Sequence, residues 1–339
     1  MTKTISSVGE DALVAAIAGS CSRIAPRLIK GMGDDTSVTV QKSGMALLAT
    51  TDSLIEGIHF VRAHTTPYLL GRRCLSVSLS DIAAMGGRPL FHLISIAMPP
   101  DTPKAFISGL YKGIDACGLE YGSCLAGGNT ASLPDRLVIS STVFGEMDKR
   151  RVVYRSGARH GDVIYVSGRL GDSALGLKIL QEDGPAALTG RYKDAVAKHL
   201  NPAPRLALGA ELAKGRLASA MMDLSDGLGI DLGRLCEASG AAGRIELAKI
   251  PVSPQLTHYA KGGLLGAAAF AAGGGEDYEL LFTSPVSRAK GIAAAARRSS
   301  TSITPIGIIT ERKRGRQTVT FLSEDGREVD LPVRGFQHF

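Results

Sequence analysis

The stretch LSVSLSDIAAMGGRPLFHLISIAM, residues 75–98, sets the architecture of the chain. Its first part belongs to a helical pattern over 66–86, and its last part, 90–98, is an apolar run typical of a strand. Around it, strands are predicted at 45–51, 123–128 and 137–147, and a second helix at 102–122. Strands and helices interleaved in this way indicate an α/β or α+β domain.

The length of 339 residues favours two domains, because a single core stops growing at about 250–300 residues. The first series of elements ends after Met147, and the charged stretch 148–162 follows it. A second series of strands and helices begins at VIYVSG (163–168). It ends with the strands TPIGII and QTVTFL, and it includes an Ala/Gly-rich helix and loop at 262–275. We therefore expect domains at 1–150 and 151–339, both of mixed α/β type.

The composition excludes several classes of protein. Apolar residues make up 44% and charged residues 21%, and no apolar run reaches the roughly 18–20 residues of a membrane span. The apolar stretch 13–21 follows Glu10 and Asp11, so an amphipathic helix is favoured over a signal peptide. Five irregularly spaced cysteines fit a reducing cytoplasm, and none is a strong nucleophile candidate.

The net charge of +7 is scattered along the chain. The one dense basic run, ERKRGR (311–316), lies between two predicted strands. We read it as a solvated hairpin tip rather than a nucleic-acid patch, and expect no nucleic-acid partner. A positive field of this kind helps to attract phosphorylated substrates.

Short aspartate motifs flanked by glycine, serine or threonine carry the functional signal. They are GMGDD (31–35), TTDSLIEGIHF (50–60), LSDIAAMGG (79–87), GGNT (127–130) and MDLSDGLGIDL (222–232). Such residues suit Mg²⁺, which prefers oxygen ligands and completes its shell with water and phosphate. No Gly-Lys dipeptide occurs, so the chain has no Walker A loop and must hold any nucleotide another way.

Each motif also has a structural explanation. Asp52 is expected at a strand end facing a cleft, and the alternative is an Asx-turn closing the strand, which is the common fate of a lone Thr-Asp pair. Asp34 and Asp35 could form a turn, and Asp81 could be a polar residue at a helix end. The small residues after Asp81 would, in the functional interpretation, permit close approach of metal and phosphate.

The segment MDLSDGLGIDL is the most specific of these motifs. Asp223 ends an apolar strand, and Ser225 and Asp226 lie where a helix begins, with backbone N–H groups available to an anion. The alternative is a simple helix cap, which needs only one such residue. Two carboxylates about 4 Å apart repel by roughly 4 kcal/mol at an effective dielectric near 20, so a cluster of them would need cations to stay ionised.

Together these motifs resemble the thiamine-monophosphate kinase family of the aminoimidazole-ribonucleotide-synthetase-like ATP-binding superfamily. The match covers nearly the whole chain in order, and includes YRSGARHGDVIYVSGRLGDSALGL, GGEDYELLFT and the terminal GFQHF. The pair TTDSLIEGIHF and GGEDYELLF is specific to this family. The resemblance implies a two-domain fold whose N-terminal sheet pairs in a homodimer and whose C-terminal domain completes the active-site cleft.

The resemblance also implies transfer of the ATP γ-phosphate to thiamine monophosphate, with several Mg²⁺ ions and K⁺ as a further candidate. The implied metal ligands are Asp34, Thr50, Thr51, Asp52, Asp81, Asn129, Asp223 and Asp226. The implied ATP contacts are Tyr111, the Gly128–Asn129 turn, Arg155 and Ser225. The implied substrate contacts are His59, Glu276 and Phe336, and catalysis would rest on Asp52, Asp81, Arg155 and Asp226.

These roles suit phosphoryl transfer, which depends on positioning and charge neutralisation rather than a covalent intermediate. Arg155 could neutralise phosphate charge, and Phe336 could pack against thiamine's rings. Structural alternatives stay open: His59 as a satisfied histidine after a strand, Glu276 and Asp277 as turn residues, and Phe336 as an anchor for the tail.

One position departs from the family pattern, which commonly has aspartate where this chain has Asn129. An amide oxygen can ligate Mg²⁺ but brings no negative charge. Two other functions stay open. One is a selenophosphate-synthetase-like enzyme, although Cys21 lies in a helical stretch rather than a glycine-rich segment. The other is a catalytically silent thiamine-phosphate or nucleotide sensor, favoured only by Asn129.

Overall fold

The computed structural model describes residues 28–30, 38–39, 42–313, 315 and 317–331. These residues form two compact units. The first lies within Met1–Ile82 and Arg88–Lys149, and the second within Ala83–Gly87 and Arg150–Phe339. The helix predicted at 13–21 lies outside the described residues. Within the described ranges, no helix has the length and apolar character to cross a membrane.

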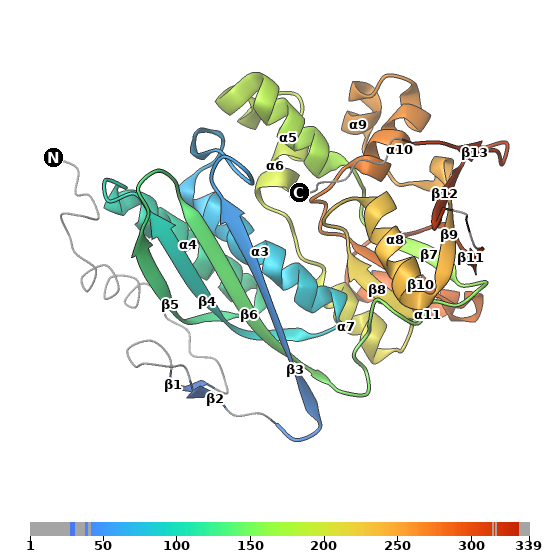
Figure 1. Ribbon diagram of the computed structural model, residues 1–339, viewed down its shortest axis with the longest axis horizontal. Coiled ribbons are helices and arrows are strands. Elements are labelled where there is room, and N and C mark those ends of the chain that lie inside the picture. Colours follow the sequence, from blue (N-terminus) through green and yellow to red (C-terminus); the bar gives the residue numbers. More distant parts are fainter. Residues whose placement is uncertain (1–27, 31–37, 40–41, 314, 316, 332–339) are drawn as a thin grey trace. The chain divides into compact units, whose positions relative to one another are not determined.

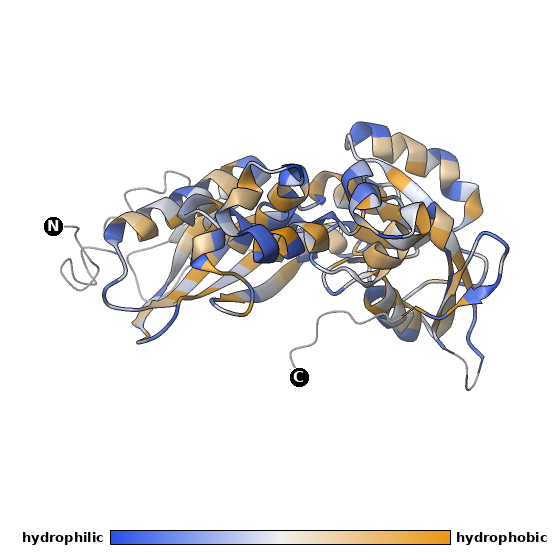
Figure 2. Cartoon of the chain, turned by 90° about the horizontal axis from the view of Figure 1, so that it is seen from above, coloured by the Kyte–Doolittle hydropathy of each residue, from blue (hydrophilic) through white to orange (hydrophobic). Residues whose placement is uncertain are grey.

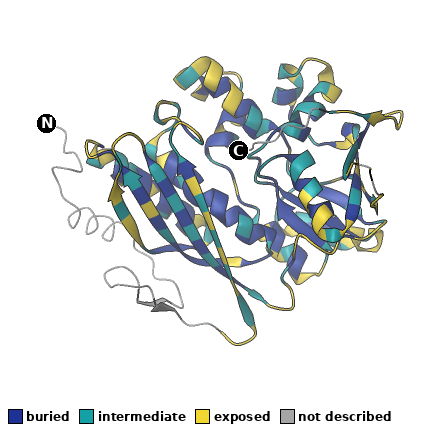
Figure 3. Ribbon diagram, in the orientation of Figure 1, coloured by how far each residue is buried: buried dark blue, intermediate teal, exposed yellow. Residues whose placement is uncertain are grey.

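The first unit is built on a four-stranded sheet with the order β3-β6-β4-β5, in which only β4 and β5 are parallel. The helices α3 and α4 cover one face of this sheet (Figure 1). The strands alternate between less and more exposed positions (Figure 3), because the other face is not covered by these helices. The elements are β1 (Leu28–Lys30), β2 (Val38–Thr39), β3 (Met45–Ile55), α3 (Pro67–Ala84), β4 (Arg88–Met98), α4 (Lys104–Tyr121), β5 (Cys124–Ser132) and β6 (Val138–Asp148).

Glycines allow α3 and α4 to cross closely. A Cβ atom at Gly71 of α3 would lie 2.0 Å from the carbonyl oxygen of Leu110, and one at Gly113 of α4 would lie 1.9 Å from that of Tyr68. Neither oxygen can yield, since both belong to the backbone of the facing helix. Both helices predicted from the sequence, at 66–86 and 102–122, are confirmed.

Two strands of this unit are longer than the sequence suggested. β3 continues through the polar residues 50–53 to Ile55, so the expectation that Asp52 lies at a strand end is wrong. β5 includes the whole GGNT motif, so Gly128 and Asn129 lie in a strand and not in a turn. Gly128 pairs with Ile94, and a Cβ atom there would lie 1.9 Å from the carbonyl oxygen of Ile94. The glycine is therefore required by the sheet itself.

The second unit contains a seven-stranded sheet with the order β13-β12-β9-β11-β7-β10-β8. Its central strands are buried (Figure 3), and apolar residues are frequent along them (Figure 2). The strands are β7 (Val163–Ser167), β8 (Ala220–Asp223), β9 (Ala241–Glu246), β10 (Leu280–Ser284), β11 (Ile303–Glu311), β12 (Val319–Leu322) and β13 (Glu328–Val329). The helices are α5 (Asp172–Asp183), α6 (Lys193–Leu200), α7 (Leu206–Lys214), α8 (Leu228–Ser239), α9 (Pro254–Tyr259), α10 (Gly263–Gly273) and α11 (Ala289–Arg298). Short 3-10 segments lie at Arg62–His64 in the first unit and at Gly184–Leu188, Leu247–Lys249 and Val286–Arg288 here.

The basic run 311–316 is not a hairpin tip. It connects β11 to β12, and β9 lies between these two strands, antiparallel to β11 and parallel to β12. The sequence interpretation failed here because two strands consecutive in the chain need not be neighbours in a sheet. The Ala/Gly-rich stretch 262–275 does form the predicted helix and loop, as α10 and the glycines after it.

Candidate active site

The side chains of β3 and α3 bring two of the predicted carboxylates together. Thr50 and Asp52 are two residues apart on β3 and therefore share one face of the sheet. The Thr50 hydroxyl donates a hydrogen bond to Oδ2 of Asp81 on α3, and the Ser78 hydroxyl, one turn earlier on α3, donates to Oδ2 of Asp52 at 2.7 Å. The structure thus places Thr50, Asp52 and Asp81 in one cluster.

The Asp52 carboxylate has a raised pKa. Burial is the largest cause, the negative charge of Asp81 adds to it, and the hydrogen bond from Ser78 opposes it. A cation between the two carboxylates would remove the repulsion and replace lost hydration. Among the described residues no three His, Cys, Asp or Glu side chains are arranged so that they could hold a metal ion by themselves. Two carboxylates with neighbouring hydroxyls nevertheless fit Mg²⁺, which commonly takes one or two carboxylates and completes its shell with phosphate and water.

Two buried serines, Ser78 and Ser141, form a hydrogen-bonded chain that ends at the Asp52 carboxylate. The Ser78 and Ser141 hydroxyl oxygens lie 2.6 Å apart, and the Ser141 hydroxyl also reaches the carbonyl oxygen of Cys74 at 2.8 Å. Each hydroxyl has one hydrogen to donate. When Ser78 donates to Asp52, the single Ser141 hydrogen is shared between two acceptors, the Ser78 hydroxyl and the Cys74 carbonyl.

Two other predicted ligands face the opposite side of the sheet. Thr51 is exposed and contacts the hydroxyl of Thr142 at 3.0 Å. Asn129 is exposed on β5, which forms the opposite edge of the sheet from β3. In the sheet register Asn129 pairs with Ser95, Ser95 with Ser140, and Ser140 with Ser53 on β3. Asn129 is therefore three strand spacings, or about 14 Å, from the matching position on β3. Within one copy of the chain, Asn129 therefore does not join the cluster at Asp52.

In the second unit, the segment before α8 differs from the expectation of free N–H groups. Oδ2 of Asp231 accepts hydrogen bonds from the backbone N–H groups of Ser225, Asp226 and Gly227, at 3.0, 3.0 and 3.1 Å. These donors are already satisfied by a carboxylate of the same helix. Neither Ser225 nor Asp226 is the helix cap, because Gly227 occupies that position.

The aspartates of this segment have unequal surroundings. Asp223 is buried at the last position of β8, as expected for a residue that ends an apolar strand. Asp226 forms an ion pair with Arg234 at 2.5 Å. Burial raises the pKa of Asp231 to about 6, the backbone donor at Asp226 lowers it, and the charge of Asp226 raises it further.

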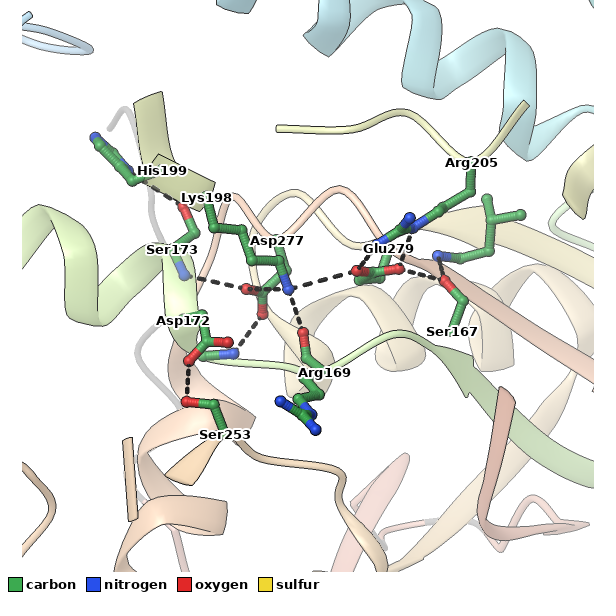
Figure 4. Close-up of polar contacts among 12 residues, drawn as sticks. Ser167, Arg169, Asp172, Ser173, Lys198, His199, Arg205, Ser253, Asp277 and Glu279 are labelled. Atoms are coloured by element: carbon green, nitrogen blue, oxygen red, sulfur yellow. Dashed lines mark hydrogen bonds and ion pairs between the residues drawn. The ribbon is translucent and has the colours of Figure 1, made fainter. Parts of the chain in front are cut away.

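The GGEDYE segment contributes a buried polar network that the sequence motifs did not indicate (Figure 4). The Asp277 carboxylate accepts hydrogen bonds from the backbone N–H groups of Gly171 and Ser173, at the start of α5. The Glu279 carboxylate accepts two hydrogen bonds from the Arg205 guanidinium, from Nε at 2.6 Å and from Nη2 at 2.5 Å. Burial raises the pKa of Asp277 to about 7, whereas hydrogen bonds and charge from Arg205 and Lys198 overcome burial and lower the pKa of Glu279.

The remaining predicted residues are placed as follows. The Nδ1 atom of His59 accepts the backbone N–H of Ile55 at 3.1 Å, which satisfies one ring nitrogen. Tyr111 is buried on α4, and Arg155 is exposed. Asp34 and Phe336 lie outside the described residues.

Three of the four cysteines that the structure describes are not activated nucleophiles. Cys74, Cys117 and Cys236 are buried, and burial raises their thiol pKa values to about 12, 11 and 12. The thiolate is the reactive form, so these thiols are inert at neutral pH.

The small residues after Asp81 also have a packing role. A Cβ atom at Gly86 would lie 2.4 Å from Cβ of Ala213, and one at Gly209 of α7 would lie 2.1 Å from the carbonyl oxygen of Ala83. The end of α3 thus packs closely on α7, so its small residues are explained without a ligand.

Comparison with known proteins identifies the family. The N-terminal domain of the AIR synthase related proteins matches residues 33–147, and the C-terminal domain of the same proteins matches residues 159–320. The thiamine-monophosphate kinase of Bacillus subtilis is 31% identical over 91% of this chain and 93% of its own length. The structure of thiamine-monophosphate kinase from Stenotrophomonas maltophilia has a TM-score of 0.80 at 30% identity, covering 93% of this chain and 95% of that one.

A second similar structure carries ligands. AaThiL, complexed with AMPPCP and TMP, has a TM-score of 0.73 at 33% identity, covering 100% of both chains. With curated relatives above 30% identity over nine-tenths of the sequence, and both domain models matched in order, the chain belongs to the thiamine-monophosphate kinase family of AIR synthase related proteins.

Proposed function

We propose that the chain transfers the γ-phosphate of ATP to thiamine monophosphate, giving thiamine diphosphate and ADP in a single in-line step. The observation that carries this proposal, beyond family membership, is the pairing of Asp52 with Asp81 beside the Thr50 hydroxyl. The inert thiols agree with direct transfer, because no covalent intermediate is needed.

Asp52, Asp81 and Thr50 would hold Mg²⁺ in the first unit. When bound, Mg²⁺ supplies positive charge that neutralises the phosphate oxygens during transfer. Ser78 would fix the direction of the Asp52 carboxylate, a role that outer partners of metal ligands commonly have. The family resemblance adds Asp34, Thr51, Asn129, Asp223 and Asp226 to the proposed ligands, with K⁺ as a further candidate cofactor.

The other proposed contacts also follow the family resemblance. The ATP contacts would be Tyr111, Gly128, Asn129, Arg155 and Ser225. The thiamine monophosphate contacts would be His59, Glu276 and Phe336. Of these, exposed Arg155 is suited to meet phosphate, and half-buried Glu276 is suited to a cationic ring. Asp226 would have to exchange its ion pair with Arg234 for a metal.

We also propose that the chain acts as a homodimer in the cytoplasm. β3 and β5 each have only one neighbouring strand in the four-stranded sheet, so both sheet edges are open within the described residues. β3 would pair with β5 of a second copy, in the register that sets Asn129 of the partner subunit beside Thr51. This arrangement offers a reason why Asn129 lies about 14 Å from the cluster in a single copy.

The deciding experiment incubates purified protein with ATP, Mg²⁺ and thiamine monophosphate, beside a control with free thiamine. Equal amounts of thiamine diphosphate and ADP, formed only from the monophosphate, would support the proposal. ATP binding without product would favour another acceptor or the silent sensor. Asp52→Ala and Asp81→Ala should each lower turnover by orders of magnitude with the fold intact, and near-normal rates would remove the metal assignment.

A further inference from the structure

The turn that carries Glu276 has an unusual backbone. Glu276 has φ of 62° and Tyr278 has φ of 51°, so two residues with side chains adopt the left-handed conformation on either side of Asp277. Only Arg216 and Ser300 share this among the non-glycine residues that the structure describes. Each such residue costs on the order of 1–3 kcal/mol and persists only where its surroundings impose it.

The backbone and the side chain of this turn are held by different neighbours. The N–H groups of Glu276 and Tyr278 donate to the carbonyl oxygens of Ser225 and Leu224, at 2.7 and 2.8 Å. The Asp277 side chain is buried and accepts the N–H groups of Gly171 at 2.7 Å and Ser173 at 3.3 Å. Asp277 therefore ties the turn to the N-terminus of α5, where a carboxylate is favoured.

Two consecutive residues of α6 lie beside the carboxylates of the turn and of Glu279, the residue directly before β10. The Lys198 ammonium lies 3.9 Å from Asp277 and 3.4 Å from Glu279 (Figure 4). The Nδ1 atom of His199 lies 3.4 Å from Oε2 of Glu276 and 3.2 Å from the Ser173 hydroxyl. The Glu276 carboxylate thus has a fixed neighbour in a buried histidine.

Stability alone does not account for this arrangement. Burying carboxylates is costly, and apolar replacements of buried ion pairs are often neutral or stabilising. The left-handed residues add further cost. Such features are commonly retained where a functional group must be held in one direction, and Glu276 is the exposed end of the network, with about a quarter of its side chain accessible.

We propose that Asp277 and His199 are positioning residues that hold the Glu276 carboxylate in place to bind thiamine monophosphate. Asp277 acts by fixing the backbone of the turn, and His199 acts on the carboxylate itself. A fixed negative charge at Glu276 complements the positive thiazolium ring of the substrate. This inference rests on the proposed function, in which Glu276 contacts thiamine monophosphate.

The test measures KM for thiamine monophosphate and KM for ATP separately, each at a saturating concentration of the other substrate. Asp277→Asn should raise KM for thiamine monophosphate at least about tenfold, as loss of a hydrogen bond to a charged group would, and change KM for ATP less than about twofold. Ser167→Ala is the matched control. It removes the hydrogen bond that Ser167 donates to Glu279 and the one that it accepts from the Leu280 N–H, and it leaves the contacts of Asp277 intact.

Two further measurements keep the inference refutable if Asp277→Asn does not fold. His199→Leu should raise KM for thiamine monophosphate, and His199→Asn should restore it, because the Asn amide can occupy the position of Nδ1. The double variant His199→Leu with Glu276→Gln should have the same KM for thiamine monophosphate as Glu276→Gln alone, since both changes act through one carboxylate.

The outcomes separate the two proposals. If the wild-type protein forms no thiamine diphosphate, both proposals fail. If Glu276→Gln raises KM for thiamine monophosphate but the Asp277 and His199 variants do not, only this inference fails. Equal changes in both KM values, or multiplying effects in the double variant, would show a structural role and overturn it.

Discussion

Replacing Ser78 by alanine tests whether the support of Asp52 controls metal binding. The change removes a hydroxyl that donates to the carboxylate at 2.7 Å. A hydrogen bond to a charged group contributes about 1.5–3 kcal/mol. At 1.4 kcal/mol for each factor of ten, this corresponds to a loss of about 10- to 150-fold in affinity, close to the 10- to 100-fold typical of outer-shell partners. We expect the Mg²⁺ concentration for half-maximal activity to rise by about one to two orders of magnitude.

The matched control is Ser76→Ala. Ser76 and Ser78 lie two residues apart on α3 and both are 0% exposed, but Ser76 contacts the sulfur of Cys117 at 3.3 Å rather than Asp52. Ser76→Ala should lose about 1 kcal/mol of stability, and Ser78→Ala at least as much, because its hydrogen bond is to a charged group. Direct titration with Mn²⁺, without turnover, separates binding from catalysis. An unchanged Mg²⁺ requirement in Ser78→Ala, or the same shift in Ser76→Ala, would refute the reasoning.

Three further predictions follow from single residues. Gly128→Ala should lower the free energy of unfolding by at least about 1–3 kcal/mol, since the new Cβ would meet the Ile94 carbonyl at 1.9 Å; an unchanged melting temperature would contradict this. Asn129→Asp should tighten Mg²⁺ activation by adding a negative charge, and identical Mg²⁺ dependence in steady-state kinetics would remove the idea. Burial raises the pKa of Asp277 to about 7, so the folded protein holds a proton that the unfolded chain releases above about pH 4. The contribution of Asp277 to the free energy of unfolding should therefore fall as the pH rises from about 4 to 7, by at most about 1.4 kcal/mol per pH unit. Denaturant unfolding of Asp277→Asn, measured over the same pH range, should lack this decrease.

The sequence predicted the elements well where hydrophobic periodicity decided them. α3, α4 and most strands agree with the expected ranges. The ends of β3 and β5 were misplaced, because Thr50–Ser53 and GGNT have the composition of turns. Both strands lie at sheet edges, where polar residues are tolerated on an open face. Composition alone could not distinguish such an edge strand from a turn.

The candidate site was only partly accessible to sequence reasoning. The resemblance selected Asp52 and Asp81, but a separation of 29 residues gave no sign that Thr50 and Ser78 would each bond one of them. Asp231 could have been anticipated, since an acidic residue in the first turn of a helix often reaches back to N–H groups before it. The contacts of Asp277 with Gly171 and Ser173 span more than 100 residues, and no local pattern encodes them.

The strand order of the second unit has a consequence for how the chain is made. β7, β8 and β9 never pair with one another; their neighbours are β10, β11 and β12, which all begin at or after Leu280. During synthesis, β7, β8 and β9 therefore cannot form their final strand pairs until β10, β11 and β12 have left the ribosome. A nascent or truncated chain that stops before Leu280 has apolar strands with none of their final pairings, the condition in which chaperones bind and aggregation begins. The C-terminal sixth of the chain thus decides whether the rest of that sheet forms at all.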